Sequence, residues 1–108
     1  MRGAAVFCLA LAACGPALPP EPSVQLAPDA QGIEIRPTGL RIDFGRSPGG
    51  VETTLDRELG PHQDMGLQGC PTQIAEQMRW ADLILAFTDE RFVGWRQGDA
   101  AQGLVCNS

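Results

Sequence analysis

The chain has 108 residues, with 8 basic and 13 acidic side chains and a formal net charge of −5 at pH 7. This length allows one small domain at most. The acidic balance argues against nucleic acids and anionic lipid headgroups as partners, because both are recognised by clusters of Lys and Arg.

The first residues have the pattern of a secretory signal peptide. Met1 and Arg2 supply one positive charge and are followed by an uninterrupted run of Gly, Ala, Val, Phe, Cys and Leu from Gly3 to Ala13. About 11 apolar residues suit the core of a signal peptide, whereas a helix needs ~20 to span a bilayer. We therefore predict that residues 1–13 are a signal peptide.

The end of this run, Leu11-Ala12-Ala13-Cys14, resembles the lipobox of bacterial lipoproteins. The resemblance implies cleavage before Cys14 and a diacylglycerol on its thiol, with a further acyl chain (such as palmitate) on the new amino terminus. Each acyl CH₂ in a bilayer contributes about 0.8 kcal/mol, so two or three chains anchor a protein durably. Gly15, where an Asp favours inner-membrane retention in that family, implies the periplasmic side of the outer membrane. The alternative is an ordinary signal peptide with an incidental Cys14.

Residues 14–32 form the predicted linker, a disordered tether behind the lipidated terminus. The stretch "GPALPPEPSVQLAPDAQG" carries five prolines and almost no periodicity, which favours extended, solvated chain. Residues 24–26 are a candidate for a short edge strand. The predicted domain then covers residues 33–108.

The first half of this domain predicts a hairpin followed by a helix. Apolar and polar residues alternate over 33–36 and 40–44 on either side of Pro37-Thr38-Gly39, as in two paired strands with one buried face. Ser47 is a candidate helix cap before Pro48, and an apolar stripe follows at i, i+4 and i+8. Gly60-Pro61 predicts the helix end.

The second half predicts a loop over 61–71, an undecided segment over 71–78 and a hairpin of strands 83–87 and 92–96. Residues 83–87 are apolar on both faces, which places this strand centrally. The fold class is therefore α+β, with one small antiparallel sheet of two hairpins packed on one helix. The tail "QGDAAQGLVCNS" shows no pattern of its own.

Cys70 and Cys106 are the two cysteines that remain after cleavage and lipidation. An even remainder in a secreted chain predicts a disulfide, which would attach the tail to the domain. Two free thiols, or a redox or metal pair, are the alternatives.

Candidate chemistry is sparse, and we expect neither an enzyme, a cofactor nor a bound metal. His62, Asp64 and Cys70 cluster in sequence but match no zinc spacing, and His62 is expected to be a solvated loop residue. The four aromatic residues of the second half line either a ligand groove or the core, and the core is the preferred interpretation: Trp80, Phe87, Phe92 and Trp95.

The layout of residues 47–96, including the helix end "VETTLDRELGP", is similar to that of small outer-membrane lipoproteins that accompany β-barrel assembly. Periplasmic lysozyme inhibitors share the lipobox, the small domain and a C-terminal disulfide, but their Tyr-containing motif is missing here. Together these features favour a membrane-anchored periplasmic lipoprotein with a non-enzymatic structural or protein-interaction role. The alternative is a periplasmic binder or inhibitor of a soluble protein or small ligand, which would use a protruding loop over residues 60–70.

Overall fold

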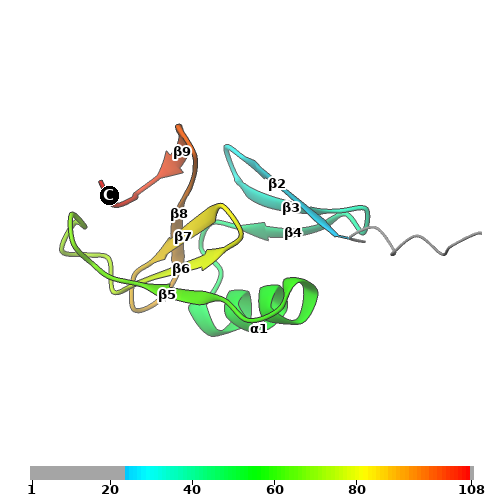
Figure 1. Ribbon diagram of the computed structural model, residues 1–108, viewed down its shortest axis with the longest axis horizontal. Coiled ribbons are helices and arrows are strands. Elements are labelled where there is room, and N and C mark those ends of the chain that lie inside the picture. The colour runs from blue at the N-terminus through cyan, green and yellow to red at the C-terminus, as the bar shows by residue number, and fades with distance from the viewer. Residues whose placement is uncertain (1–23, 108) are drawn as a thin grey trace, which may run out of the picture.

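The computed structural model describes residues 24–107 (Figure 1). Cys14, the predicted signal peptide and most of the predicted linker lie outside this range. The described residues form one helix and two antiparallel sheets, which confirms the α+β class but replaces the single expected sheet by two. None of the helical structure in residues 24–107 is long and apolar enough to cross a bilayer.

The first sheet has the order β2-β3-β4, with bounds Gln25–Asp29, Gly32–Arg36 and Leu40–Asp43. The hairpin of β3 and β4 confirms the alternating pattern, with Ile33 opposite Ile42 in a buried pair. β2 corrects the predicted linker, whose last residues form a strand. Pro28 is compatible with a strand here because β2 is an edge strand, where the missing backbone N–H of a proline costs no hydrogen bond between central strands.

An arginine joins the two edges of the first sheet on its outer side. The guanidinium of Arg41 on β4 donates to both carboxylate oxygens of Asp29 on β2, each at 2.9 Å, and to Asp43 at 2.8 Å. The hydrogen bond from Arg41 lowers the pKa of Asp29 from 3.8 to about 2. This network faces solvent, as the alternation predicts for Arg41 and Asp43.

Helix α1, Pro48–Leu59, begins and ends where the sequence predicts. The Ser47 hydroxyl accepts the backbone N–H of Gly50 at 3.3 Å, and Pro48 occupies the first turn. Gly60 stops the helix with φ 96°, a conformation that costs glycine little. Val51 and Leu55 are fully buried, whereas Leu59 remains 38% exposed.

The second sheet has five strands in the order β5-β6-β7-β8-β9. Their bounds are Gln63–Met65, Glu76–Trp80, Leu83–Phe87, Phe92–Gln97 and Ala100–Gly103. β7 and β8 are the predicted hairpin, and β7 is central as expected. The other three strands differ from the expectation. β5 lies in the predicted loop, β6 begins in the undecided segment, and β9 forms from the tail that shows no pattern.

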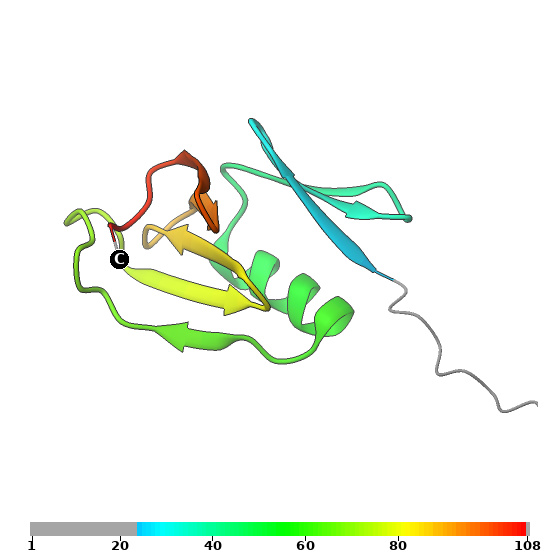
Figure 2. The ribbon, with the colours of Figure 1, turned by 45° about the horizontal axis from the view of Figure 1, so that its top comes forward.

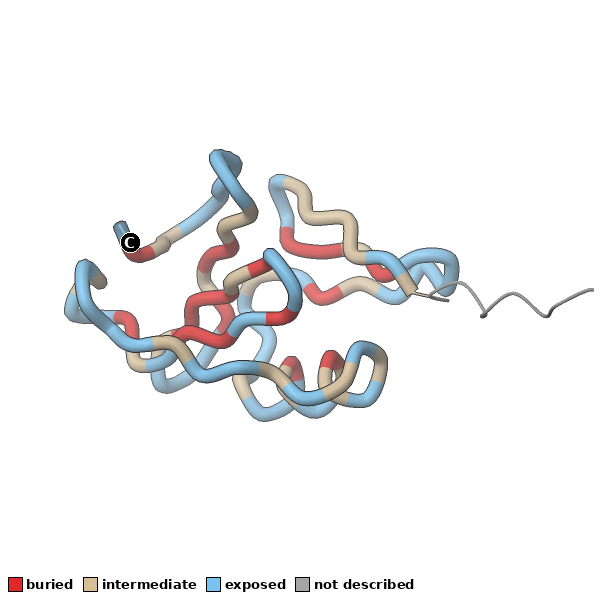
Figure 3. Tube along the Cα trace, in the orientation of Figure 1, coloured by how far each residue is buried: buried red, intermediate tan, exposed pale blue. Residues whose placement is uncertain are grey.

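One core joins α1 and both sheets, and Figure 3 shows its buried residues between them. The predicted core aromatics are confirmed, since none is more than 5% exposed: Trp80, Phe87, Phe92 and Trp95. Trp95 on β8 donates its indole N–H to the carbonyl of Asp29 on β2 at 2.8 Å. Phe92 exchanges backbone hydrogen bonds with Gly45 and Arg46, each at 2.8 Å, so the segment after β4 is joined to β8.

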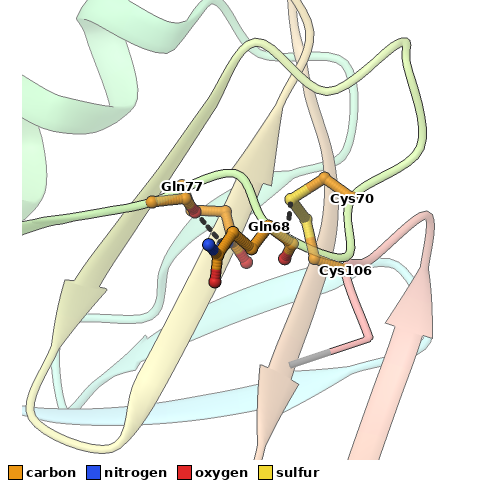
Figure 4. The surroundings of a disulfide bond; sticks show 5 residues. Gln68, Cys70, Gln77 and Cys106 are labelled. Carbon is orange, nitrogen blue, oxygen red and sulfur yellow. Dashed lines mark hydrogen bonds between the residues drawn. A yellow bond between two sulfur atoms is a disulfide. The ribbon is translucent and has the colours of Figure 1, made fainter.

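The predicted disulfide between Cys70 and Cys106 is present (Figure 4). Cys106 is buried with Ile74 and Ala86 in a second, smaller apolar cluster, and Asn107 donates its backbone N–H to Gly69 at 2.9 Å. The segment before the disulfide is fixed as well, because the buried Gln77 donates to the Gly66 carbonyl at 2.7 Å. Within residues 60–70, the segment that the binder alternative uses, Gly66 and Cys70 are thus held to the rest of the domain, while the residues between them are exposed.

Candidate functional site

A cluster of polar side chains lies where the end of α1 meets the second sheet; Figure 2 shows this junction of helix and strand at the lower edge of the domain. Glu52 and Asp56 are four residues apart on α1, so helical geometry places them on one face. His62 follows the helix end, and Asp64 is on β5. Trp80, the last residue of β6, closes the cluster from the core side.

Asp56 is the centre of this cluster. Its Oδ1 accepts the backbone N–H of His62 at 3.0 Å and the indole N–H of Trp80 at 3.1 Å. The same oxygen lies 3.0 Å from His62 Nδ1, and Oδ2 lies 3.2 Å from it. A carboxylate with this many donors accepts the Nδ1 proton, which fixes the orientation of the imidazole.

The other ring nitrogen of His62 faces two more carboxylates. Nε2 lies 3.1 Å from Asp64 Oδ1 and 3.7 Å from Glu52 Oε2. The His62 side chain is only 14% exposed, and its ring packs against that of Trp80 with centroids 5.4 Å apart. One imidazole therefore has three acidic neighbours.

These contacts correct the expectation of a solvated His62. Of the three residues that cluster in sequence, His62 and Asp64 lie in contact, whereas Cys70 forms the disulfide. Glu52 and Asp56 are absent from the predicted cluster because they precede His62 on a separate element. One signal in the sequence could have identified these two residues. An acidic pair spaced i and i+4 stands shortly before a helix stop, and the single histidine of the chain follows that stop.

The cluster shifts the pKa values of its two central members apart. The hydrogen bond with Asp56 raises the pKa of His62 above 6.5, despite the opposing effect of burial. Burial alone would raise the pKa of Asp56, but hydrogen bonds from His62 and Trp80 outweigh it and lower that pKa below 3.8. The imidazolium–carboxylate pair is thus the favoured state in the folded protein.

We predict that the free energy of unfolding falls as the pH rises from 6.5 through the raised pKa of His62. A raised folded-state pKa of His62 contributes stability that is complete below its unfolded value of 6.5 and is lost as the pH rises through the folded value. The lowered pKa of Asp56 acts oppositely, and its contribution is lost as the pH falls through a value below 3.8. Urea unfolding in EDTA at a series of pH values measures this dependence.

The His62→Gln variant is the control, because it removes the single histidine of the chain. Its stability should be nearly independent of pH over that interval. In the wild type, the indole N–H resonance of Trp80 should shift as His62 titrates, and that of Trp95 should not, since Trp95 donates to a backbone carbonyl. Parallel stability curves for the two proteins would contradict the assignment.

Beside the cluster is a cleft of about 420 Å³ between β2, the end of α1 and the β6–β7 turn. Its lining is mostly apolar, with one carboxylate and two amides at the rim: Val24, Gln25, Leu26, Leu59, Pro61, Trp80, Ala81, Asp82, Leu83 and Gln97. Gln97 donates to Asp82 at 3.1 Å, which orients the carboxylate. Ala81 has φ 55°, an uncommon conformation for a residue with a side chain.

The cluster and the cleft share structure. Leu59 and Pro61, on one wall of the cleft, lie within the segment that the contacts of Asp56 with His62 close into a loop. Trp80 lines the cleft and also donates its indole N–H to Asp56. The ionic cluster therefore braces a wall of the cleft.

The lining offers apolar contact area and one oriented carboxylate, and it contains no histidine, cysteine or serine. Such a surface suits the binding of an apolar group that carries a positive charge or a hydrogen-bond donor. No protein-family model, curated protein or solved structure matches this chain.

Proposed function

We propose that this protein is a lipid-anchored lipoprotein of the cell envelope that binds another envelope protein and catalyses no reaction. The observation that carries the proposal is the sequence Leu11-Ala12-Ala13-Cys14 behind a short apolar run with a charged start. The folded domain, whose first described strand is β2 at Gln25, supports it, because a lipid anchor needs a separate domain to display. The periplasmic face of the outer membrane is the proposed location, from Gly15 after the cysteine.

The length of chain between the anchor and the domain limits where the cleft can act. About ten residues separate Cys14 from Val24, which lines the cleft, and an extended chain spans at most ~3.6 Å per residue. The cleft then lies within roughly 35 Å of the membrane surface. A partner that is itself in or near that membrane is within reach.

The chemistry of the cleft indicates what part of the partner it receives. Val24, Leu26 and Leu59 present apolar surface, and the exposed Asp82 supplies a negative charge. Removal of residues 1–13 takes away Arg2, which leaves a formal net charge of −6 on the rest of the chain. We therefore infer that the partner inserts apolar side chains flanked by Lys or Arg, since opposite charges speed encounter and favour the correct partner.

The anchoring is tested by intact mass and membrane fractionation in a Gram-negative host. The wild type should have the mass of a chain that begins at Cys14 with added acyl groups, and it should sediment with membranes. Cys14→Ala should lose both properties, because the lipid has no thiol to attach to. Cys8→Ala is the matched control, since Cys8 lies inside the predicted signal peptide.

Three results would contradict the anchor: an unmodified wild type, a Cys14→Ala protein that keeps its acyl mass, or equal loss in both cysteine variants. A soluble, unmodified wild type would favour the alternative, a freely diffusing periplasmic binder or inhibitor.

Binding through the cleft is tested by site-specific photo-crosslinking in intact cells, with the photoreactive residue in place of Gln25 at the rim. Leu59→Gln should abolish the discrete crosslinked adduct, because it places a polar amide where an apolar side chain lines the cleft. Leu67→Gln is the matched control, since Leu67 is similarly exposed at 46% but lies outside the cleft. Equal adduct yields from the two leucine variants would rule out the cleft as the binding surface.

A further inference from the structure

We propose that the His62 cluster is a binding site for one divalent transition-metal ion of the zinc class, held by His62, Glu52 and Asp64 and oriented by Asp56. The proposal is independent of the proposed function. Potential ligand atoms of Glu52, Asp56 and His62 lie within 4.8 Å of one another, and Asp64 adds a carboxylate oxygen 3.1 Å from His62 Nε2. An imidazole with carboxylates is a donor set that zinc accepts and that a hard cation such as Mg²⁺ does not prefer.

The distances around His62 Nε2 suit two further ligands. Two ligands of a tetrahedral zinc with bonds of about 2.0–2.1 Å lie roughly 3.4 Å apart. Nε2 is 3.1 Å from Asp64 Oδ1 and 3.7 Å from Glu52 Oε2, on either side of that value. The Asp64 side chain is 83% exposed, so it is free to adjust its position. A water molecule would complete the coordination.

Asp56 supplies the outer contact that metal-binding histidines normally have, in which the second ring nitrogen donates its proton to a carboxylate. Here that carboxylate is itself fixed from the core by the indole N–H of the buried Trp80, at 3.1 Å. The backbone N–H of His62 adds a second donor at 3.0 Å. Nδ1 of His62 is therefore preset to carry a proton, and Nε2 faces Glu52 and Asp64, where it can bind a metal ion once it has lost its own proton.

The charge of the cluster also favours a cation. Glu52, Asp56 and Asp64 all have their described ion pairs with His62, so three carboxylates share one imidazolium. Binding of a divalent ion reduces this excess negative charge, because two positive charges replace the single positive charge of the imidazolium. It releases the Nε2 proton of His62 to solvent, so a protonated site gives up one proton for each ion bound.

The test is a titration of the full chain, purified in detergent without an affinity tag, with ZnCl₂ followed by isothermal calorimetry. We expect one saturable site, and Glu52→Gln should weaken binding about 10-fold or more, with a larger loss in His62→Gln. Glu90→Gln is the matched control, because Glu90 is an exposed carboxylate in the β7–β8 turn. Glu52 has no role in the core, so its variant remains informative even if His62→Gln fails to fold.

A second readout reports where the ion binds. The indole N–H resonance of Trp80 should shift on addition of Zn²⁺, while that of Trp95 stays in place, because only Trp80 donates to the carboxylate that orients His62. Absence of saturable binding up to about 1 mM Zn²⁺ would overturn the proposal. Equal affinity in the wild type and Glu52→Gln, or equal shifts of both indole resonances, would do so too.

Discussion

Replacing Cys70 and Cys106 together by Ala is expected to lower the free energy of unfolding by about 4 kcal/mol. The two residues are 36 positions apart, and a crosslink across a loop of this length removes much of the conformational entropy of the unfolded chain. A domain of this size buries a modest share of its surface and has little stability to spare. We therefore expect the double variant to be largely unfolded near 37 °C.

Urea or thermal unfolding, followed by tryptophan fluorescence, measures this loss. Reduction of the wild type with a phosphine should lower its stability to a similar extent, whereas the same reductant should leave the double variant unchanged. A wild type that loses less than ~1 kcal/mol on reduction would show that the loop is already ordered in the unfolded ensemble.

Gly94→Ala is expected to be the most damaging small substitution, with a cost of about 3 kcal/mol or more. A Cβ on Gly94 would lie 2.0 Å from the Leu104 carbonyl oxygen and 2.8 Å from its nitrogen, so the backbone after β9 would have to move. Leu104 donates its N–H to the Val93 carbonyl at 2.9 Å, a bond that such a shift would break. The displaced segment leads directly to Cys106.

Gly66→Ala is the matched control, because an added Cβ at the exposed Gly66 would meet nothing within 4 Å. It should change the free energy of unfolding by less than ~1 kcal/mol. Equal unfolding midpoints for the two alanine variants, in oxidised protein, would show that the segment after β9 moves aside at little cost.

Elements whose cause is local were predictable from the sequence. The cap at Ser47, the proline after it and the stop at Gly60 define α1, since each acts on its own backbone neighbourhood. Apolar and polar residues alternate in β3 and β4, and β7 is an apolar run, and these patterns indicate which faces of the strands are buried. The pairing of Cys70 with Cys106 followed from there being two candidates.

The strands that the sequence did not predict in full lack such a pattern. All four residues of β9 are exposed, so only its backbone pairing with β8 makes it a strand. β2 is predicted only in part, as the candidate edge strand over residues 24–26, because Pro28 is typical of a linker and is accommodated only by the edge position. In β6 the polar Gln77 is buried because its side chain reaches the Gly66 carbonyl, a partner eleven residues away.

The sequence by itself determined the anchor hypothesis, the α+β class, the helix and the disulfide, because each depends on residues that are adjacent or few in kind. Only the tertiary structure decided that the chain divides its strands between two sheets and that Trp80 of β6 meets Asp56 of α1. It also brought Glu52 and Asp64 to the two sides of His62. Contacts between residues far apart depend on how buried faces pack against each other, and that packing leaves no periodic signal in either segment.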